Sequence, residues 1–196
     1  MKAFKNLIKS IQNISPEIEI KLNKPASKSD FNKLINVLDV KTLPKEFVDL
    51  YSLCNGQDSG TSGLIGHWEL IEIKFIVKEI QLMKELNQKN VFKNASTIKS
   101  KFVTNTWWDE KWIPFVSSGS GHYYCIDLNP NTKGTFGQVL LFIHDDDLRP
   151  LIAKNLNEWF ERITEDINKG VYKYKDGNYN NEAFVKSSIE AKKLYK

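Results

Sequence analysis

Three short runs rich in aromatic and β-branched residues lie close together in the second half of the chain, and they constrain the fold more than any other feature. They cover residues 112–116, 122–128 and 138–143, and glycine, serine and proline residues separate them. Runs of this length, bounded by turn residues, are typical of β-strands. Because the connections between them are short, neighbouring runs pair most readily as antiparallel strands. We therefore expect a meander of three consecutive strands.

The loop between the first two runs has the composition of a catalytic or phosphate-binding loop. It reads SSGSGH from Ser117 to His122. It lacks a GxSxG nucleophile motif, a P-loop lysine and a following helix whose N-terminus could hold a phosphate. We interpret it as a hairpin turn with His122 at a strand edge, and we place Trp112 and Phe115 in or near the core.

Apolar residues repeat at helical spacing on both sides of these strands. A helix is predicted after Pro44, with Asn55 and Gly56 at its end, and a short strand near Leu70 is followed by a further helix. The other predicted helices cover residues 4–11, 29–38 and about 148–168. The last of these has the strongest apolar stripe, with Pro150 in its first turn. Helices on both sides of a meander indicate the α+β class, with an antiparallel or mixed sheet packed against several helices.

The chain has 196 residues, a length that suits one domain. We assign residues 1–170 to a single α+β domain and residues 171–196 to a lysine-rich extension with a short helix from about residue 181. No run approaches the roughly 20 apolar residues of a membrane span, and the first residues lack the apolar block of a signal peptide. Cys54 and Cys125 lie in apolar runs without CxxC spacing, which indicates buried thiols. We expect a cytosolic protein.

The net charge of +4 raises the question of nucleic-acid binding. The positive charge belongs to the two ends of the chain, whereas the middle, where the strands are predicted, is mildly acidic. Arginine is the residue that pairs with phosphate and guanine through two hydrogen bonds, and the sequence contains only Arg149 and Arg162. Direct binding of nucleic acid is therefore not expected.

Three aspartates follow the third strand, in the sequence HDDD from His144 to Asp147. The first interpretation is that Asp145, Asp146 and Asp147 cap a helix that begins near Leu148. A second is that they form part of an acidic binding face, which capping does not exclude. A third is a Mg²⁺ or Ca²⁺ site, but consecutive residues at a strand exit splay their side chains. We predict no metal site and no cofactor.

The stretch TWWDEKW precedes the first strand and is either an aromatic interface edged by charge or a lid over the sheet. We place Trp112 in the core and Trp108 at an interface. Since this stretch and the HDDD run adjoin strands of one meander, we expect their loops to project near one another. The candidate partner-binding residues are Trp107, Trp108, Asp109, Glu110, Asp145, Asp146 and Asp147. Three isolated histidines and the absence of a nucleotide-binding fingerprint give no catalytic residues, and we do not expect an enzyme.

Five segments occur in a characteristic order: LPKEFVDLYSLCNG, GHWELIEI, WIPFVSSGSGHYYCIDLNP, GQVLLFIHDD and LIAKNLNEWFERI. In this order the chain resembles, over residues 27–170, the SUKH superfamily, which includes Smi/Knr cell-wall regulators and bacterial immunity proteins. The resemblance implies an α+β domain that binds proteins without catalysis.

On this resemblance we expect an immunity protein that neutralises a cognate polymorphic toxin, such as a nuclease, whose basic surface would meet the acidic residues. The alternative is a regulatory scaffold of the cell-wall-control type. A metal-dependent enzyme is a third hypothesis, and it depends on residues 144–147 alone.

Overall fold

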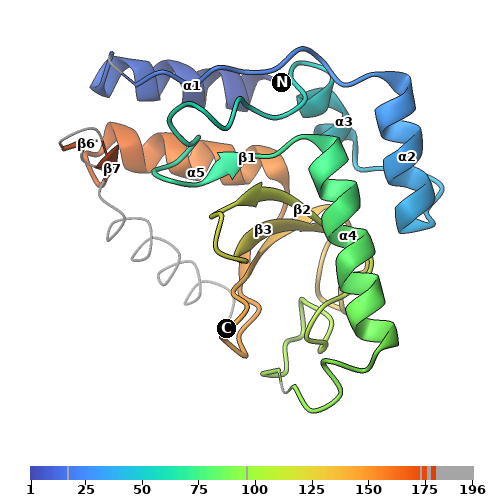
Figure 1. Cartoon of the computed structure of the whole chain (residues 1–196). Coiled ribbons are helices and arrows are strands. Elements are labelled where there is room, and N and C mark those ends of the chain that lie inside the picture. The colour runs from blue at the N-terminus through green and yellow to red at the C-terminus, as the bar shows by residue number, and fades with distance from the viewer. Residues whose placement is uncertain (17, 96, 173, 176–177, 180–196) are drawn as a thin grey trace.

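The computed structural model describes residues 1–16, 18–95, 97–172, 174–175 and 178–179 (Figure 1). The helix expected from about residue 181 lies outside these residues. The helices are α1 (Lys2–Ile14), α2 (Lys28–Leu38), α3 (Lys45–Tyr51), α4 (Ile73–Gln88) and α5 (Leu156–Asn168). The strands are β1 (Glu69–Leu70), β2 (Trp112–Ser117), β3 (Tyr123–Asp127), β4 (Gln138–Phe142), β5 (Leu151–Ala153), β6 (Tyr174–Lys175) and β7 (Asn178–Tyr179).

The first five strands form one antiparallel sheet in the order β1-β2-β3-β4-β5. Cys125 in the central strand lies opposite Pro114 on one side and Leu140 on the other. The register shifts between Pro114 and Val116, where proline has no N–H to donate to the ladder. The predicted meander, the hairpin turn after Ser117 and the α+β class are confirmed.

The segment before α5 differs from the prediction of a helix that starts near residue 148. Residues 151–153 form strand β5, which pairs with β4, and the helix begins only at Leu156. Pro150 restricts the chain before the strand, and the Asn155 side chain accepts a hydrogen bond from the Glu158 N–H at 2.9 Å. Asn155 is therefore the N-cap of α5, and the prediction that the aspartate run caps this helix is wrong.

The segment between α3 and α4 is held by buried polar contacts. Gln57 Oε1 accepts hydrogen bonds from the N–H groups of Leu64 and Leu70, both at 3.0 Å. Asn55 Oδ1 accepts from the N–H of Ile73, the first residue of α4, at 2.9 Å. Gly56 between them has a φ of +75°, as expected for a left-handed residue. This tight connection fixes where α4 begins.

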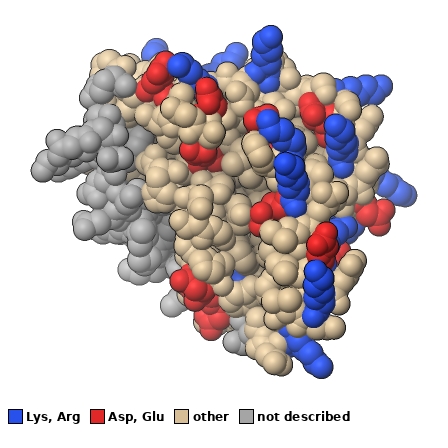
Figure 2. Space-filling view, viewed as in Figure 1, with Lys and Arg blue, Asp and Glu red and all other residues tan. Residues whose placement is uncertain are grey.

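The helices form two groups around the sheet (Figure 1). Helices α1 and α5 lie side by side, and α2 packs against α4. Lysine and arginine side chains gather over α2 and α4, with some acidic side chains between them (Figure 2). Among the described residues, no helix combines the length and the apolar composition that crossing a bilayer requires.

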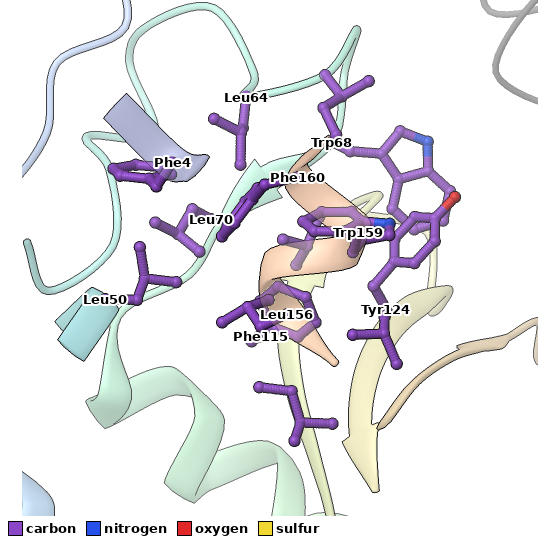
Figure 3. Close-up of a cluster of buried hydrophobic side chains, with 14 of the residues drawn as sticks. Phe4, Leu50, Leu64, Trp68, Leu70, Phe115, Tyr124, Leu156, Trp159 and Phe160 are labelled. Atoms are coloured by element: carbon purple, nitrogen blue, oxygen red, sulfur yellow. The ribbon is translucent and has the colours of Figure 1, made fainter. Parts of the chain in front are cut away.

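The larger core contains buried residues of the sheet and of all five helices α1 to α5, and Figure 3 shows the part of it around α5. Trp159 of α5 is its centre: its ring centroid is 5.2 Å from that of Phe115 and 5.1 Å from that of Tyr124. Trp68 extends this aromatic cluster, with its ring 5.0 Å from Tyr124. Tilted and edge-on contacts of this kind favour a single arrangement of the rings.

A second, smaller core covers the opposite face of the sheet. Its buried residues are Met83, Val103, Trp108, Trp112, Cys125, Leu140, Phe142 and Leu151. Because both faces are covered, every residue of β4 is buried and the strand has no alternation of apolar and polar residues. The prediction of buried thiols is confirmed, since Cys54 and Cys125 are both free and buried.

Candidate functional site

The two acidic segments predicted to share one surface lie at opposite ends of the meander. Asp109 and Glu110 precede β2, whose first residue is opposite Asp127, at the end of β3 where β4 begins. The 145–147 run follows β4, whose last residue is opposite Tyr123 at the other end of β3. Four residue steps along β4 separate the two ends by about 13 Å. One combined acidic patch stays a prediction, and the contact between the two segments runs through Trp107 and Arg149.

Trp108 is a core residue, not an exposed anchor. Its side chain is 2% exposed, and its ring lies 5.0 Å from Phe142 and 5.7 Å from Trp112. The segment before β2 crosses the second face of the sheet, and Trp108 fills the space between them. The expected interface role of Trp108 is corrected to core packing, and the expected core position of Trp112 is confirmed.

Asp109 and Glu110 make contacts within the domain. Asp109 accepts hydrogen bonds from the Lys111 N–H at 2.9 Å and from the Asn129 side-chain amide at 2.8 Å. Glu110 lies 3.8 Å from the ammonium group of Lys84 on α4. These contacts hold the start of β2 against the end of β3 and against α4.

Trp107 and the aspartate run meet through Arg149, which sequence reasoning did not select. The Arg149 guanidinium lies 4.5 Å from the ring centroids of both Trp107 and Phe142. It donates hydrogen bonds to the backbone oxygens of Trp107 at 3.1 Å and of Leu148 at 2.7 Å. Burial lowers the pKa of Arg149 to about 10, because desolvation disfavours the charged form. Its position before proline in a loop was the signal available in the sequence.

The three aspartates at residues 145–147 lie in different environments. Asp146 Oδ1 accepts a hydrogen bond from the Leu148 N–H at 2.8 Å, which closes a local turn. The backbone oxygen of Asp147 accepts from the Ile98 N–H at 3.0 Å. The side chain of Asp145 is exposed and approaches two histidines.

His122 and His144 come together at this same end of the sheet. Their rings are stacked, with centroids 4.7 Å apart and planes inclined by 17°, and their Nδ1 atoms are 3.3 Å apart. Ligand atoms of His122, His144 and Asp145 all lie within 4.8 Å of one another. His122 lies one residue before β3, as predicted for a strand-edge histidine.

The most exposed apolar side chains of α4 are Phe75 and Leu82, which are 46% and 48% exposed. They are seven residues apart and so lie on one face, two turns from each other. The ammonium groups of Lys74 and Lys78 lie 4.8 Å and 5.5 Å from the centre of the Phe75 ring. This α4 face, defined by Phe75, Leu82 and the two lysines, is an apolar surface edged by positive charge.

A groove of about 450 Å³ lies beside this face, between α2 and α4. It is lined by Lys33, Asn36, Val37, Val77 and Gln81. The α4 face and the groove lie on neighbouring parts of α2 and α4, where Figure 2 shows basic side chains with acidic ones between them. The sequence did not indicate this surface, because the apolar residues of the predicted helix were all assigned to its buried side.

The fold defines the class: an α+β domain with a five-stranded antiparallel meander covered on both faces. Residues 25–162 match the SMI1 / KNR4 family (SUKH-1). Since this match covers most of the chain, the protein belongs to that family.

Three fungal relatives extend the comparison. The KNR4/SMI1 homolog 2 of Debaryomyces hansenii is 24% identical over 88% of this chain and 36% of its own length. The glucan synthesis regulatory protein of Neurospora crassa is 25% identical over 79% of this chain and 36% of its own length. The cell wall assembly regulator SMI1 of Saccharomyces cerevisiae is 22% identical over 84% of this chain and 39% of its own length. The chain thus spans well under half of the length of these relatives.

Proposed function

We propose that the chain is a non-catalytic protein-binding domain with a regulatory role of the cell-wall-control type. Membership of the SMI1 / KNR4 family carries the proposal. The three relatives described above include a cell wall assembly regulator and a glucan synthesis regulatory protein. These names favour a regulatory scaffold over the immunity protein that we expected first, since they give no support to a toxin as the partner.

The two buried cysteines offer no reactive thiol for catalysis. Burial raises the pKa of Cys54 to about 11 and that of Cys125 well above its ordinary value, so both thiols are protonated and unreactive at neutral pH. Two free, buried thiols also fit a reducing compartment, and the cytosol remains part of this proposal.

The α4 face is the partner surface in this proposal. Phe75 and Leu82 offer apolar area that no other described element covers, and Lys74 and Lys78 add positive charge at its edge. A partner segment with apolar side chains flanked by carboxylates complements this surface. This differs from the basic partner that the predicted acidic residues implied, because the α4 face carries lysines at its edge.

The test compares three immobilised forms of the full chain: wild type, the double variant Phe75→Glu/Leu82→Glu, and Phe136→Glu. Phe136 is 50% exposed on the β3–β4 connection and serves as the matched control. Proteins that the immobilised wild-type chain retains are identified by mass spectrometry. Each identified protein is then produced on its own and titrated against the three forms by calorimetry. We expect the double variant to bind about thirtyfold more weakly or worse, and the control to bind like wild type.

Two results would contradict the proposal. Equal binding of a purified partner to all three forms would remove the α4 face from it. A partner that is toxic when expressed alone and harmless when co-expressed with the chain would replace regulation with immunity. Equal melting temperatures of the three forms establish that the variants are folded.

A further inference from the structure

The geometry points to a transition-metal site of the zinc type, formed by His122, His144 and Asp145 at the end of the sheet where β3 begins and β4 ends. The three side chains come from two loops that the sheet brings together. Tyr123 is opposite Phe142 in the ladder, so the residues just beyond this pair are neighbours as well. His122 precedes Tyr123, and His144 and Asp145 follow Phe142 by two and three residues.

The separation of the two imidazoles matches that of two ligands on one metal ion. Zinc–nitrogen bonds of about 2.0–2.1 Å at the tetrahedral angle place two ligand nitrogens about 3.3 Å apart. The Nδ1 atoms of His122 and His144 are 3.3 Å apart, and an oxygen of Asp145 lies within 4.8 Å of the ligand atoms of both histidines. A movement of the exposed carboxylate and a rotation of one imidazole ring complete three protein ligands, and a water molecule supplies the fourth.

Metal binding requires one of the two imidazole rings to rotate from its present orientation. The rings are stacked at 17°, so one ring must rotate before both lone pairs point to a single ion. His144 is exposed and Gly121 beside it carries no side chain; a Cβ at Gly121 would lie 3.3 Å from His144 Nδ1. The backbone N–H of His144 donates to His122 Nδ1 at 3.3 Å. This is a long hydrogen bond, and a bond from Nδ1 to a metal would replace it. The structure therefore leaves room for the rotation.

The donor set selects the class of metal. Two imidazoles and one carboxylate suit Zn²⁺, Ni²⁺ or Cu²⁺, whereas Mg²⁺ and Ca²⁺ prefer oxygen ligands throughout. This site differs from the oxygen-only site considered for residues 144–147, since it requires His122 from another loop.

The test titrates Zn²⁺ into the chelator-treated full chain by calorimetry. We expect saturable binding of one equivalent, and about tenfold or greater weakening in each of His122→Gln and His144→Gln. The matched control is Asp147→Asn, which removes an adjacent carboxylate outside the cluster and should bind like wild type. Mg²⁺ should produce no saturable heat. The variants must melt at the wild-type temperature in chelator, which separates loss of the ligand from loss of the fold.

Nitrogen NMR of the histidine side chains provides the second readout. His67 is the one other histidine of the sequence, so it serves as an internal reference. Zinc should shift the ring nitrogens of His122 and His144 far more than those of His67, which is not one of the proposed ligands. At zinc about a hundredfold above Kd, the melting temperature should rise by about 5–10 °C. Equal zinc binding by the His122→Gln/His144→Gln double variant, or no saturable binding by wild type, would overturn the inference.

Discussion

Asp127 and Gln138 are cross-strand partners at one end of the sheet, and the Gln138 side-chain amide donates a hydrogen bond to the Asp127 carboxylate at 2.8 Å. The same amide nitrogen donates to the backbone oxygen of Phe102 at 2.8 Å. Asp127 is fully buried, and this burial raises its pKa to about 6. The pair therefore attaches the segment before β2 to the meander through a carboxyl group that titrates at mildly acidic pH.

The first prediction concerns pH. Because the pKa of Asp127 is higher in the folded state than its ordinary value of 3.8, the native protein binds more protons than the unfolded chain between about pH 4 and 6. The stability that this group contributes is full below that window and is lost as the pH rises through it. Relative to wild type, Asp127→Asn should therefore gain on the order of 2–3 kcal/mol between about pH 4 and 7. Urea unfolding across this range measures the gain, and a constant difference between the two proteins would contradict it.

Gly56 and Gly119 form a matched pair of left-handed glycines, with φ values of +75° and +76°. A Cβ at Gly56 would lie 2.6 Å from the backbone nitrogen of Glu72, whereas one at Gly119 would meet nothing within 4 Å. Gly119→Ala should cost about 1 kcal/mol from backbone strain alone. Gly56→Ala should cost about 2–4 kcal/mol, because backbone must also move. Denaturant midpoints measure both costs, and equal costs would show that the close approach does not matter.

Trp108→Ala should destabilise the domain by about 3–5 kcal/mol, since it empties the centre of the smaller core. The control is Phe136→Ala, which removes a half-exposed ring and should change stability by less than about 0.5 kcal/mol. Thermal and denaturant unfolding of both variants measures the difference. A Trp108→Ala protein as stable as wild type would restore the interface role that the sequence suggested.

Asn155→Ala should destabilise the domain by about 1 kcal/mol through loss of the cap of α5. Asp147→Ala should change the free energy of unfolding by less than about 0.5 kcal/mol, because its hydrogen bond to the Ile98 N–H uses the backbone oxygen. Chemical denaturation compares the two variants directly. The opposite ranking would place the helix cap in the aspartate run after all.

The elements that could be predicted are those whose local sequence pattern fits a strand or a helix but not both. The strands β2, β3 and β4 are short, aromatic or β-branched, and bounded by turn residues, so period and composition agree. Strand β5 was missed because Leu151 and Ile152 fit both a buried strand and the apolar stripe of the following helix. Pairing with β4 and the cap at Asn155 decide between them, and the pairing is a tertiary contact.

The candidate site was less accessible to sequence reasoning, because its members are distant in the chain. Trp108 was misplaced since residues 97–111 have no period that shows which face they cover. The proximity of His122 and His144, in contrast, follows from the strand register. Tyr123 is opposite Phe142, so His122, just before Tyr123, and His144, two residues after Phe142, are neighbours beyond the same end of the two strands. Extending the predicted pairing by two residues would have found them. Arg149 gave no such signal beyond its position before proline.

The two outermost strands of the sheet are its shortest, with two residues in β1 and three in β5. A strand edge exposes unpaired backbone groups that can recruit a strand from another molecule, and the hazard grows with the length of the edge. The longer strands β2, β3 and β4, most of whose residues are buried, are enclosed between these short ones, which leaves little backbone for a neighbour to extend. A domain of this design can be held at high local concentration, as within an assembly, with a low tendency toward edge-to-edge aggregation.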